Sequence, residues 1–316
     1  MSRRDSTGRR PTIGIVFPGD MGAAFGKLLQ SGGFPVVTTL EGRSERTARA
    51  CGEAGLPVLD SLDDVVAAAD TVVSLVPPQA AVEVAERFAD LAIEFGHAPM
   101  YVDANSISPS TLGAVERHIE RAGAALVDAS IHGLASRIAA HGTLYLSGPA
   151  AGKLAEDWNG LIRIRCLGDR LGLASLQKML LAGMSKGLVA LFVEMALVAR
   201  QSELLPEFLD ETRRHYPAVM EMMDRLLPTV PRHARRRGAE MEELETMTER
   251  LGLRPGLIAE CRRLYAELGR SDLEQRAESL PACQGLEAVL EFIGGLQPLA
   301  PHAAGQPGTS TTHCHH

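Results

Sequence analysis

Two lysines stand in the most apolar part of the chain, where a charged side chain is suited to proton chemistry. Lys178 and Lys186 lie among leucines and methionines that recur every three or four residues, which predicts a helix. On that helix both lysines share one broad face with Ala182 and Ser185. Burial and a neighbouring cation lower the pKa of a lysine, which suits a general acid or base. The alternative is that both side chains keep their ammonium groups in water.

A glycine loop near the start of the chain is typical of a phosphate site. It follows an apolar run, Thr12 to Phe17, and precedes an expected helix. Glycines let the backbone approach a pyrophosphate, and a helix N-terminus offers free N–H groups. The pattern G-x-G-x-x-G is incomplete because Phe17 occupies the first glycine position. The alternative is a glycine turn needed only for packing. The predicted cofactor residues here are Gly19, Asp20, Met21 and Gly22.

The segment after the second expected strand bears on the type of nucleotide. A carboxylate there binds a ribose 2′-hydroxyl, whereas a 2′-phosphate needs a cation and hydroxyl donors. Arg43 and Ser44 provide the second set, with Arg46 as a further candidate, and Glu41 favours the first. We therefore expect NADP in preference to NAD.

Short apolar runs alternate with helical patterns through the first half of the chain. Continuous Val/Ile/Leu runs are typical of strands buried on both faces of a parallel sheet. Alternation with short connections predicts an α/β, doubly wound parallel sheet of Rossmann type. The expected strands are Thr12–Phe17, Val36–Leu40, Thr71–Val76, Met100–Ala104, Ala125–Asp128 and Leu144–Ser147, and the expected helices between them include 22–29, 44–54 and 79–95.

After about Cys166 the pattern is helical throughout, which predicts an all-α C-terminal domain. The long helix 173–204 is apolar around nearly its whole circumference, so we expect it to be the central helix of that domain or of a homodimer. Further helices are expected at about 217–227, 231–251, 255–268 and 286–296. The predicted organisation is a disordered lead-in (1–11), a nucleotide-binding domain (12–166), a substrate and dimerisation domain (167–297) and a disordered tail (298–316).

Composition and charge argue against several classes of protein, namely nucleic-acid-binding, disulfide-rich and membrane proteins. A net charge of −7 argues against a nucleic-acid partner. Five scattered cysteines predict a reducing compartment, without a disulfide framework. We expect no membrane span, because Glu194 interrupts the most apolar stretch, and no secretory signal, because no apolar leader precedes the first strand. The protein is expected to be cytoplasmic, and the His/Cys residues at its end are not expected to form a metal site.

With these motifs in this order, the chain resembles the β-hydroxyacid dehydrogenase superfamily, which includes 6-phosphogluconate dehydrogenase and 3-hydroxyisobutyrate dehydrogenase. It looks closest to a branch with a 6-phosphogluconate-dehydrogenase-type NAD-binding domain and a distinct C-terminal helical domain, over about residues 12–296. Gly19, Met21 and Gly22 match the family loop G-x-G-x-M-G. The resemblance implies hydride transfer between a nicotinamide cofactor and a small hydroxy or keto substrate, expected to be acidic.

The resemblance also assigns later loops. Val76-Pro77 and Asn105 match family loops that flank the nicotinamide. The substrate loop matches Asp128 to Leu134, which makes Ser130, His132 and Gly133 substrate-binding candidates. His132 is also a candidate acid, and a structural histidine is the alternative.

On the long helix the resemblance makes Lys178 the general acid or base and Lys186 a catalytic residue or a holder of an anionic substrate group. The family asparagine is Ala182 here, and the acid glutamate of 6-phosphogluconate dehydrogenase is Ser185. The decarboxylating reaction of that enzyme is therefore not expected to carry over. Arg236 and Glu240 match a stretch of this branch and are candidates for gating the substrate, or they form a surface ion pair.

Two other functions remain open. Imine reductases resemble this fold but generally lack the helix lysine, so Lys178 favours hydroxy or keto substrates. A non-catalytic nucleotide-binding regulator is the second alternative, because the first glycine, the asparagine and the acid glutamate are all replaced.

Overall fold

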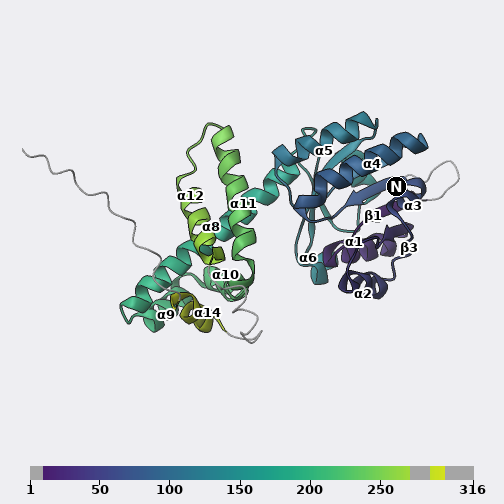
Figure 1. Cartoon of the computed structure of the whole chain (residues 1–316). Helices are drawn as coiled ribbons and strands as arrows, with labels where there is room; N and C mark the ends of the chain where they lie inside the picture. Colours follow the sequence, from purple (N-terminus) through teal and green to yellow (C-terminus); the bar gives the residue numbers. More distant parts are fainter. Residues whose placement is uncertain (1–9, 271–284, 296–316) are drawn as a thin grey trace, which may run out of the picture. The chain divides into compact units, whose positions relative to one another are not determined.

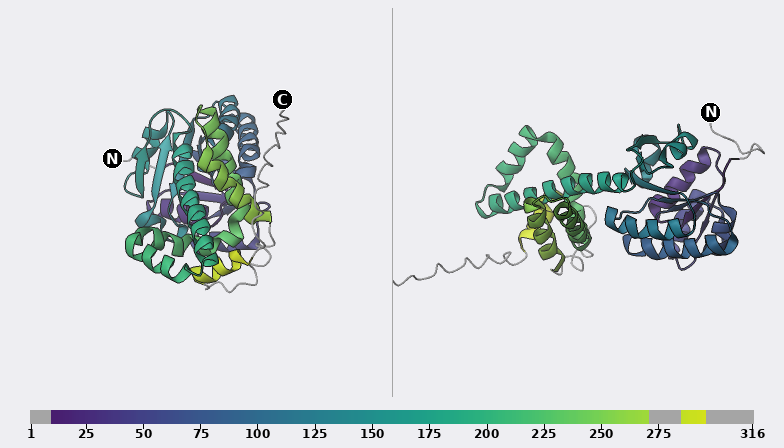
Figure 2. Two further views of the ribbon diagram at one scale, coloured as in Figure 1. Left: turned by 90° about the vertical axis from the view of Figure 1, so that its left-hand side faces the viewer. Right: turned by 90° about the horizontal axis from the view of Figure 1, so that it is seen from above.

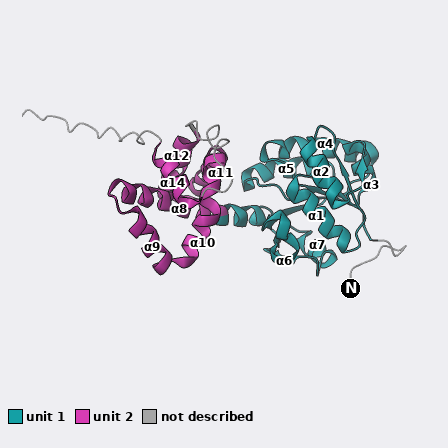
Figure 3. Cartoon of the chain, turned by 90° about the horizontal axis from the view of Figure 1, so that it is seen from below, with its two compact units in different colours: residues 1–181 teal, residues 182–316 magenta. Residues whose placement is uncertain are grey.

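The computed structural model describes residues 10–270 and 285–295. The chain divides into two compact units, residues 1–181 and 182–316, which Figure 3 colours separately. The division falls inside one continuous helix. The predicted tail and the lead-in through residue 9 lie outside the described residues.

The first unit is built on a sheet with the strand order β3-β2-β1-β4-β5-β6-β7-β8 among its described residues. The order reverses between β1 and β4, which is the switch point where open α/β sheets bind ligands. The bounds are β1 Ile13–Val16, β2 Val36–Thr39, β3 Val58–Leu59, β4 Thr71–Ser74, β5 Met100–Asp103, β6 Leu126–His132, β7 Thr143–Ser147 and β8 Arg163–Cys166.

The strands are parallel except where β7 runs antiparallel to β6. Only η2 (Ala135–Arg137) and α6 (Ile138–His141) connect these two strands. That connection is too short for the crossover that a parallel pair requires. The edge strand β8 was not expected from the sequence, because its side chains are mostly exposed and lack an apolar run. The doubly wound, Rossmann-type class is confirmed.

Helices cover both faces of the sheet, as Figures 1 and 2 show. Phe25 of α1 and Trp158 pack on one face, in edge-to-face contact at 5.5 Å. Phe88 of α4 and Leu112 of α5 pack on the other face. The sequence analysis did not anticipate α3, α5 or α7. The bounds are α1 Asp20–Ser31, α2 Glu45–Ala54, α3 Leu62–Ala68, η1 Pro78–Ala80, α4 Ala81–Phe95, α5 Pro109–Arg121 and α7 Ala151–Asp157.

The second unit is helical throughout its described residues, as expected. Helices α11 and α12 pack against each other. Prolines occupy the first turns of α9, α10 and α11, where a missing N–H costs nothing. The bounds are α8 Leu173–Gln201, which begins in the first unit, α9 Leu205–His215, α10 Pro217–Leu226, η3 Leu227–Thr229, α11 Val230–Arg250, α12 Gly256–Arg270 and α14 Leu286–Gly294.

Helix α8, expected to be the central helix of the domain or of a homodimer, is only partly buried within this chain. Several of its apolar side chains are exposed within this chain, among them Met184 (66%), Leu191 (50%) and Val198 (57%). By length and composition alone α8 also qualifies as a candidate membrane span, with a window of mean hydropathy 1.7. This result departs from the expectation that no segment qualifies. Charged residues along α8, including Glu194, favour a helix of a folded domain.

Candidate functional site

The glycine loop has the backbone shape of its motif although one glycine is missing. Phe17 has φ +46°, a left-handed conformation that side chains rarely adopt. Gly19 precedes α1, and a Cβ there would meet nothing within 4 Å. A Cβ on Gly22 would lie 2.7 Å from Cβ of Pro18, so the turn requires glycine at this position. The first intrahelical bond runs from the Ala23 N–H to the Gly19 carbonyl, so the preceding N–H groups of α1 point out of the helix end.

A tight turn after β2 presents the predicted 2′-phosphate residues. The Arg43 N–H donates to the Leu40 carbonyl at 2.9 Å, and Gly42 has φ +66°. The Oγ of Ser44 accepts a bond from the Thr47 N–H and caps α2. The Nε of Arg43 is buried and has no hydrogen-bond partner in the described part of the chain. A buried donor without an acceptor is rare, and this one is available to an added anion.

Two ion pairs surround this turn. Arg46, the further candidate for the phosphate, pairs with Asp20 of the glycine loop at 2.5 Å. The carboxylate of Glu41 pairs with Arg87 of α4. Asp20 and Glu41, two acids of the loops that follow β1 and β2, are therefore each paired with an arginine.

The loops after β4 and β5 are tied together by Asn105. Its Oδ1 accepts a bond from the Val76 N–H at 2.7 Å. Its Nδ2 donates to Asp103 at 2.8 Å and to Ser74 at 3.0 Å. Asn105 thereby holds the Val76-Pro77 segment at the carboxyl edge of the sheet, where the sequence analysis placed the nicotinamide.

Buried Asp128 fixes the start of α8. Its carboxylate accepts bonds from the N–H groups of Ala174 (2.9 Å) and Ser175 (3.1 Å), from the Ser175 hydroxyl (2.6 Å) and from the Ser147 hydroxyl (2.7 Å). A carboxylate at a helix N-terminus is also favoured by the helix dipole. The Oγ of Ser130 donates to the Ala174 carbonyl at 2.9 Å. These bonds fix the helix turn that precedes Lys178.

Lys178, His132 and Asp103 form an electrostatically coupled group in the first unit. The pKa of Asp103 is raised to about 7, mainly by burial. The negative charge of Asp128 also acts to raise this pKa, whereas the ammonium of Lys178 acts to lower it. Burial lowers the pKa of His132, and Lys178 lowers it further. The His132 ring packs edge-to-face on Tyr145 at 5.0 Å, and its Nε2 is buried with no hydrogen-bond partner among the described residues. A neutral imidazole with a spare nitrogen beside an ammonium is suited to binding a substrate oxygen. Gly133, with φ +133°, follows this strand.

Lys186 lies in the second unit, together with the two other predicted substrate residues of that unit, Arg236 and Glu240. Its Nζ pairs with Glu240 at 2.5 Å and is only 11% exposed, and Arg236 pairs with the same carboxylate at 3.3 Å. The Tyr265 hydroxyl donates to the Lys186 carbonyl at 3.0 Å. Within the second unit the fold therefore gathers Lys186, Arg236 and Glu240 into one cluster.

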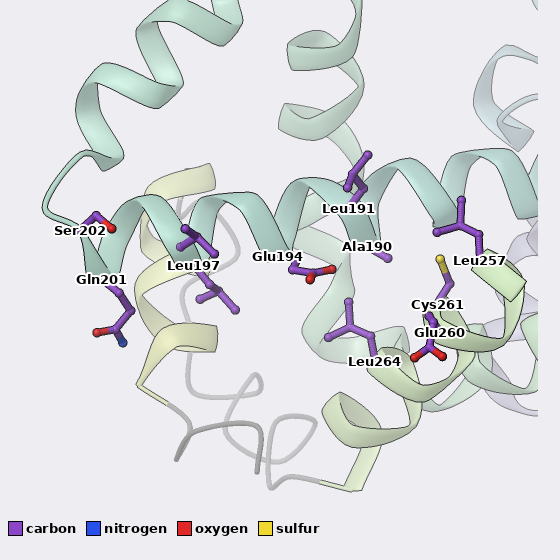
Figure 4. Close-up of a pocket in the computed structure, with 11 residues that line it drawn as sticks. Ala190, Leu191, Glu194, Leu197, Gln201, Ser202, Leu257, Glu260, Cys261 and Leu264 are labelled. Atoms are coloured by element: carbon purple, nitrogen blue, oxygen red, sulfur yellow. The ribbon is translucent and has the colours of Figure 1, made fainter. Parts of the chain in front are cut away.

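An apolar pocket of about 430 Å³ lies between α8 and α12. Figure 4 shows the residues that line it, among them Leu257, Cys261 and Leu264 of α12 and Ala190, Glu194 and Leu197 of α8. None of the predicted site residues lines it. Its walls are mostly apolar, and Glu194 and Glu260 are the charged members of the lining.

Sequence reasoning missed several residues that build the site. Asp128 was read only as part of the substrate loop, and Ser147, Ser175 and Arg87 were not considered. A carboxylate within a buried apolar strand is a signal that could have singled out Asp128. The partners of that carboxylate lie in segments whose proximity no local pattern reveals.

The residues fit a dinucleotide cofactor. The loops at the switch point of the sheet offer open space beside Gly19 and the free N–H groups at the start of α1. They also offer the Nε of Arg43, which has no partner among residues 10–270 and 285–295. Backbone N–H groups suit a pyrophosphate, and a guanidinium suits a phosphate.

Comparisons with known proteins agree with this arrangement. Residues 12–156 match the family described as the NAD binding domain of 6-phosphogluconate dehydrogenase, and residues 199–268 match a domain of unknown function, DUF1932. A relative from Methanothermus fervidus, described as an uncharacterized 28.5 kDa protein in the 7S RNA 5′ region, is 28% identical over 235 residues, 74% of this chain and 89% of its own.

Solved structures show the same fold. A conserved protein of unknown function, reported as structurally similar to 3-hydroxyacid dehydrogenases, is 28% identical with a TM-score of 0.64, over 86% of this chain and 100% of that chain. The 3-hydroxyisobutyrate dehydrogenase of Mycobacterium tuberculosis, solved with L-serine, is 18% identical with a TM-score of 0.66, over 90% and 99%. An imine reductase from Myxococcus stipitatus in complex with NADP⁺ is 18% identical with a TM-score of 0.56, over 89% and 99%.

Proposed function

We propose that the chain is an NADP-dependent oxidoreductase of a small hydroxy or keto acid, related to the β-hydroxyacid dehydrogenases. Its matches to the NAD binding domain of 6-phosphogluconate dehydrogenase and to DUF1932, and its similarity to a protein that resembles 3-hydroxyacid dehydrogenases, support this proposal. Its domain composition supports a dehydrogenase or reductase. The substrate class, the preference for NADP and the roles of the individual residues are what we propose.

The coupled group of Lys178, His132 and Asp103 is the observation that carries the proposal. Lys178 takes the proton from a substrate hydroxyl, or returns it to a carbonyl, through Nζ. The neutral imidazole of His132 holds the substrate oxygen. A bound nicotinamide cofactor supplies or accepts the hydride. The bonds that Asp128 makes to the first turn of α8 keep the lysine in place.

The cofactor preference follows from the turn after β2. Arg43 and Ser44 recognise a 2′-phosphate, while Gly19, Asp20, Met21 and Gly22 hold the pyrophosphate with backbone N–H groups. Asn105 and the Val76-Pro77 segment support the nicotinamide end.

The second unit contributes Lys186, Arg236 and Glu240 as a cluster that binds an acidic substrate group. We also propose that the protein is cytoplasmic. We propose further that it forms a homodimer through α8, because the exposed apolar side chains of this helix are unfavourable in water unless another surface buries them. A second copy of the chain is the occupant that we propose for the pocket between α8 and α12.

The experiment is a turnover screen of short 3-hydroxy acids with NADP⁺, followed by NADPH absorbance, on wild type and on Lys178→Met. We expect turnover by wild type and a loss of roughly 10²–10⁴-fold in kcat for the variant, with NADPH affinity retained. The control Lys153→Met changes an exposed lysine of α7 and should leave turnover unchanged.

Three outcomes would contradict this proposal. Reduction of a cyclic imine that survives Lys178→Met would favour an imine reductase. Tight NADPH binding with no turnover across both panels would favour a regulatory protein. Failure to bind either nucleotide would exclude a dehydrogenase.

A further inference from the structure

Arg87 and Glu41 are distant in the sequence and meet beside the predicted nucleotide site. Arg87 lies on α4, and Glu41 follows β2. The Nη2 of Arg87 donates to both carboxylate oxygens of Glu41, at 3.1 and 3.3 Å, and to Oδ1 of Asp63 at 3.3 Å. The Leu62 N–H, at the start of α3, donates to Glu41 at 3.4 Å. The carboxylate is therefore held against α3 and α4.

A carboxylate at this position affects which nucleotide fits. When free, a glutamate after the second strand accepts a hydrogen bond from a ribose 2′-hydroxyl and repels a 2′-phosphate. Arg43 follows two residues later, and its buried Nε lacks a partner in the described part of the chain. The segment after β2 therefore carries Glu41, which favours a ribose 2′-hydroxyl, close to Arg43, which favours a 2′-phosphate. Which of the two residues acts depends on the partner of Glu41.

We propose that Arg87 sets the cofactor preference by holding and neutralising the Glu41 carboxylate, so that Arg43 receives a 2′-phosphate. This inference rests on the proposed function and adds a residue outside the nucleotide loops. Arg87 acts through Glu41 and is a positioning residue. The Arg87 and Glu41 side chains are each 43% exposed, so both can be replaced without disturbing the core.

The test measures the affinities for NADPH and NADH by fluorescence titration. The variants are Arg87→Ala, Glu41→Gln and the double variant. We expect wild type to prefer NADPH, and Arg87→Ala to reduce that preference about tenfold because the released Glu41 repels the phosphate. In the Glu41→Gln background, Arg87→Ala should change the preference by less than about twofold, since the carboxylate then released is that of Asp63 on α3 and no longer that of the residue after β2.

The matched control is Arg121→Ala. Arg121 pairs with Asp90 at 2.6 Å with a similarly exposed side chain, so its loss removes the same charge without freeing Glu41. We expect the preference of this variant to equal that of wild type. A wild-type preference for NADPH that Arg87→Ala leaves intact would overturn the inference while the proposed function stands.

Two further results separate the remaining explanations. A loss of NADPH affinity on Arg87→Ala that persists in the Glu41→Gln background would mean that Arg87 contacts the phosphate itself, which overturns the positioning role. Wild type that binds neither nucleotide would overturn the proposed function, and the inference with it.

Discussion

At the scale of single residues, burial sets the charge states in the first unit. Asp103 and Asp128 are opposite each other on β5 and β6, and both are fully buried. Burial raises the pKa of Asp103 to about 7. The Asp128 carboxylate accepts four hydrogen bonds, three of them from the first turn of α8. The two neighbouring acids therefore differ in their hydrogen-bond partners, although both are buried.

The raised pKa of Asp103 predicts a pH-dependent stability. The folded state holds a proton on this carboxyl group up to about pH 7, and the unfolded state loses it near 3.8. The contribution of Asp103 to the free energy of unfolding therefore falls as the pH rises from about 4 to about 7, by roughly 2–4 kcal/mol. We expect the free energy of unfolding of wild type, minus that of Asp103→Asn, to fall over that range. Urea denaturation followed by Trp158 fluorescence measures both values. A difference that is flat or rises with pH would contradict this assignment.

The positive φ of Phe17 predicts an unusual order of stabilities. Phe17→Gly and Phe17→Ala both remove the ring, but only glycine adopts φ +46° without strain. The glycine variant should be more stable than the alanine variant by about 1 kcal/mol, although alanine is normally favoured. Denaturation of the two proteins side by side measures this, and an alanine variant of equal or greater stability would refute it.

At the scale of elements, the first turn of α8 is the segment that positions Lys178 for the proposed chemistry. Helix α8 carries Lys178 one turn after the bonds to Asp128. The apolar pattern of the helix predicts that it forms, but it does not fix the direction in which it leaves the sheet. Three hydrogen bonds from Ala174 and Ser175 to the buried carboxylate of Asp128 fix that direction.

Removing one of these bonds should destabilise the first unit. Ser175→Ala deletes the donor 2.6 Å from Asp128, and the side chain is buried. We expect a loss of roughly 1.5–3 kcal/mol in the free energy of unfolding. The exposed Ser136→Ala should change it by less than about 0.5 kcal/mol. Equal effects of the two substitutions would show that the anchor contributes nothing.

At the scale of the whole molecule, the exposed apolar face of α8 indicates assembly. Leu191, Met195 and Val198 are 50%, 41% and 57% exposed and recur at helical spacing on one face. An apolar face of this kind on a water-exposed helix is typical of an interface.

We expect wild type to be a dimer and the double variant Leu191→Glu, Val198→Glu to be a monomer, because each charge would be buried unpaired in the interface. Size-exclusion chromatography with light scattering measures both. Ile93→Glu places the same charge at a 51% exposed position on α4 and should leave the dimer intact. A monomeric wild type, or a double variant that stays dimeric, would exclude α8 as the interface.

The sequence by itself determined the alternation of strands and helices, the position of the glycine loop and the long helix that carries Lys178. Each of these is a local pattern, because periodicity and turn residues act over a few positions. Only the tertiary structure decided the direction of β7, the anchoring of α8 by Asp128, the pairing of Glu41 with Arg87 and that of Lys186 with Glu240. These contacts join residues about fifty positions apart, or join separate helices. Their partners are brought together by the fold, which no local pattern encodes.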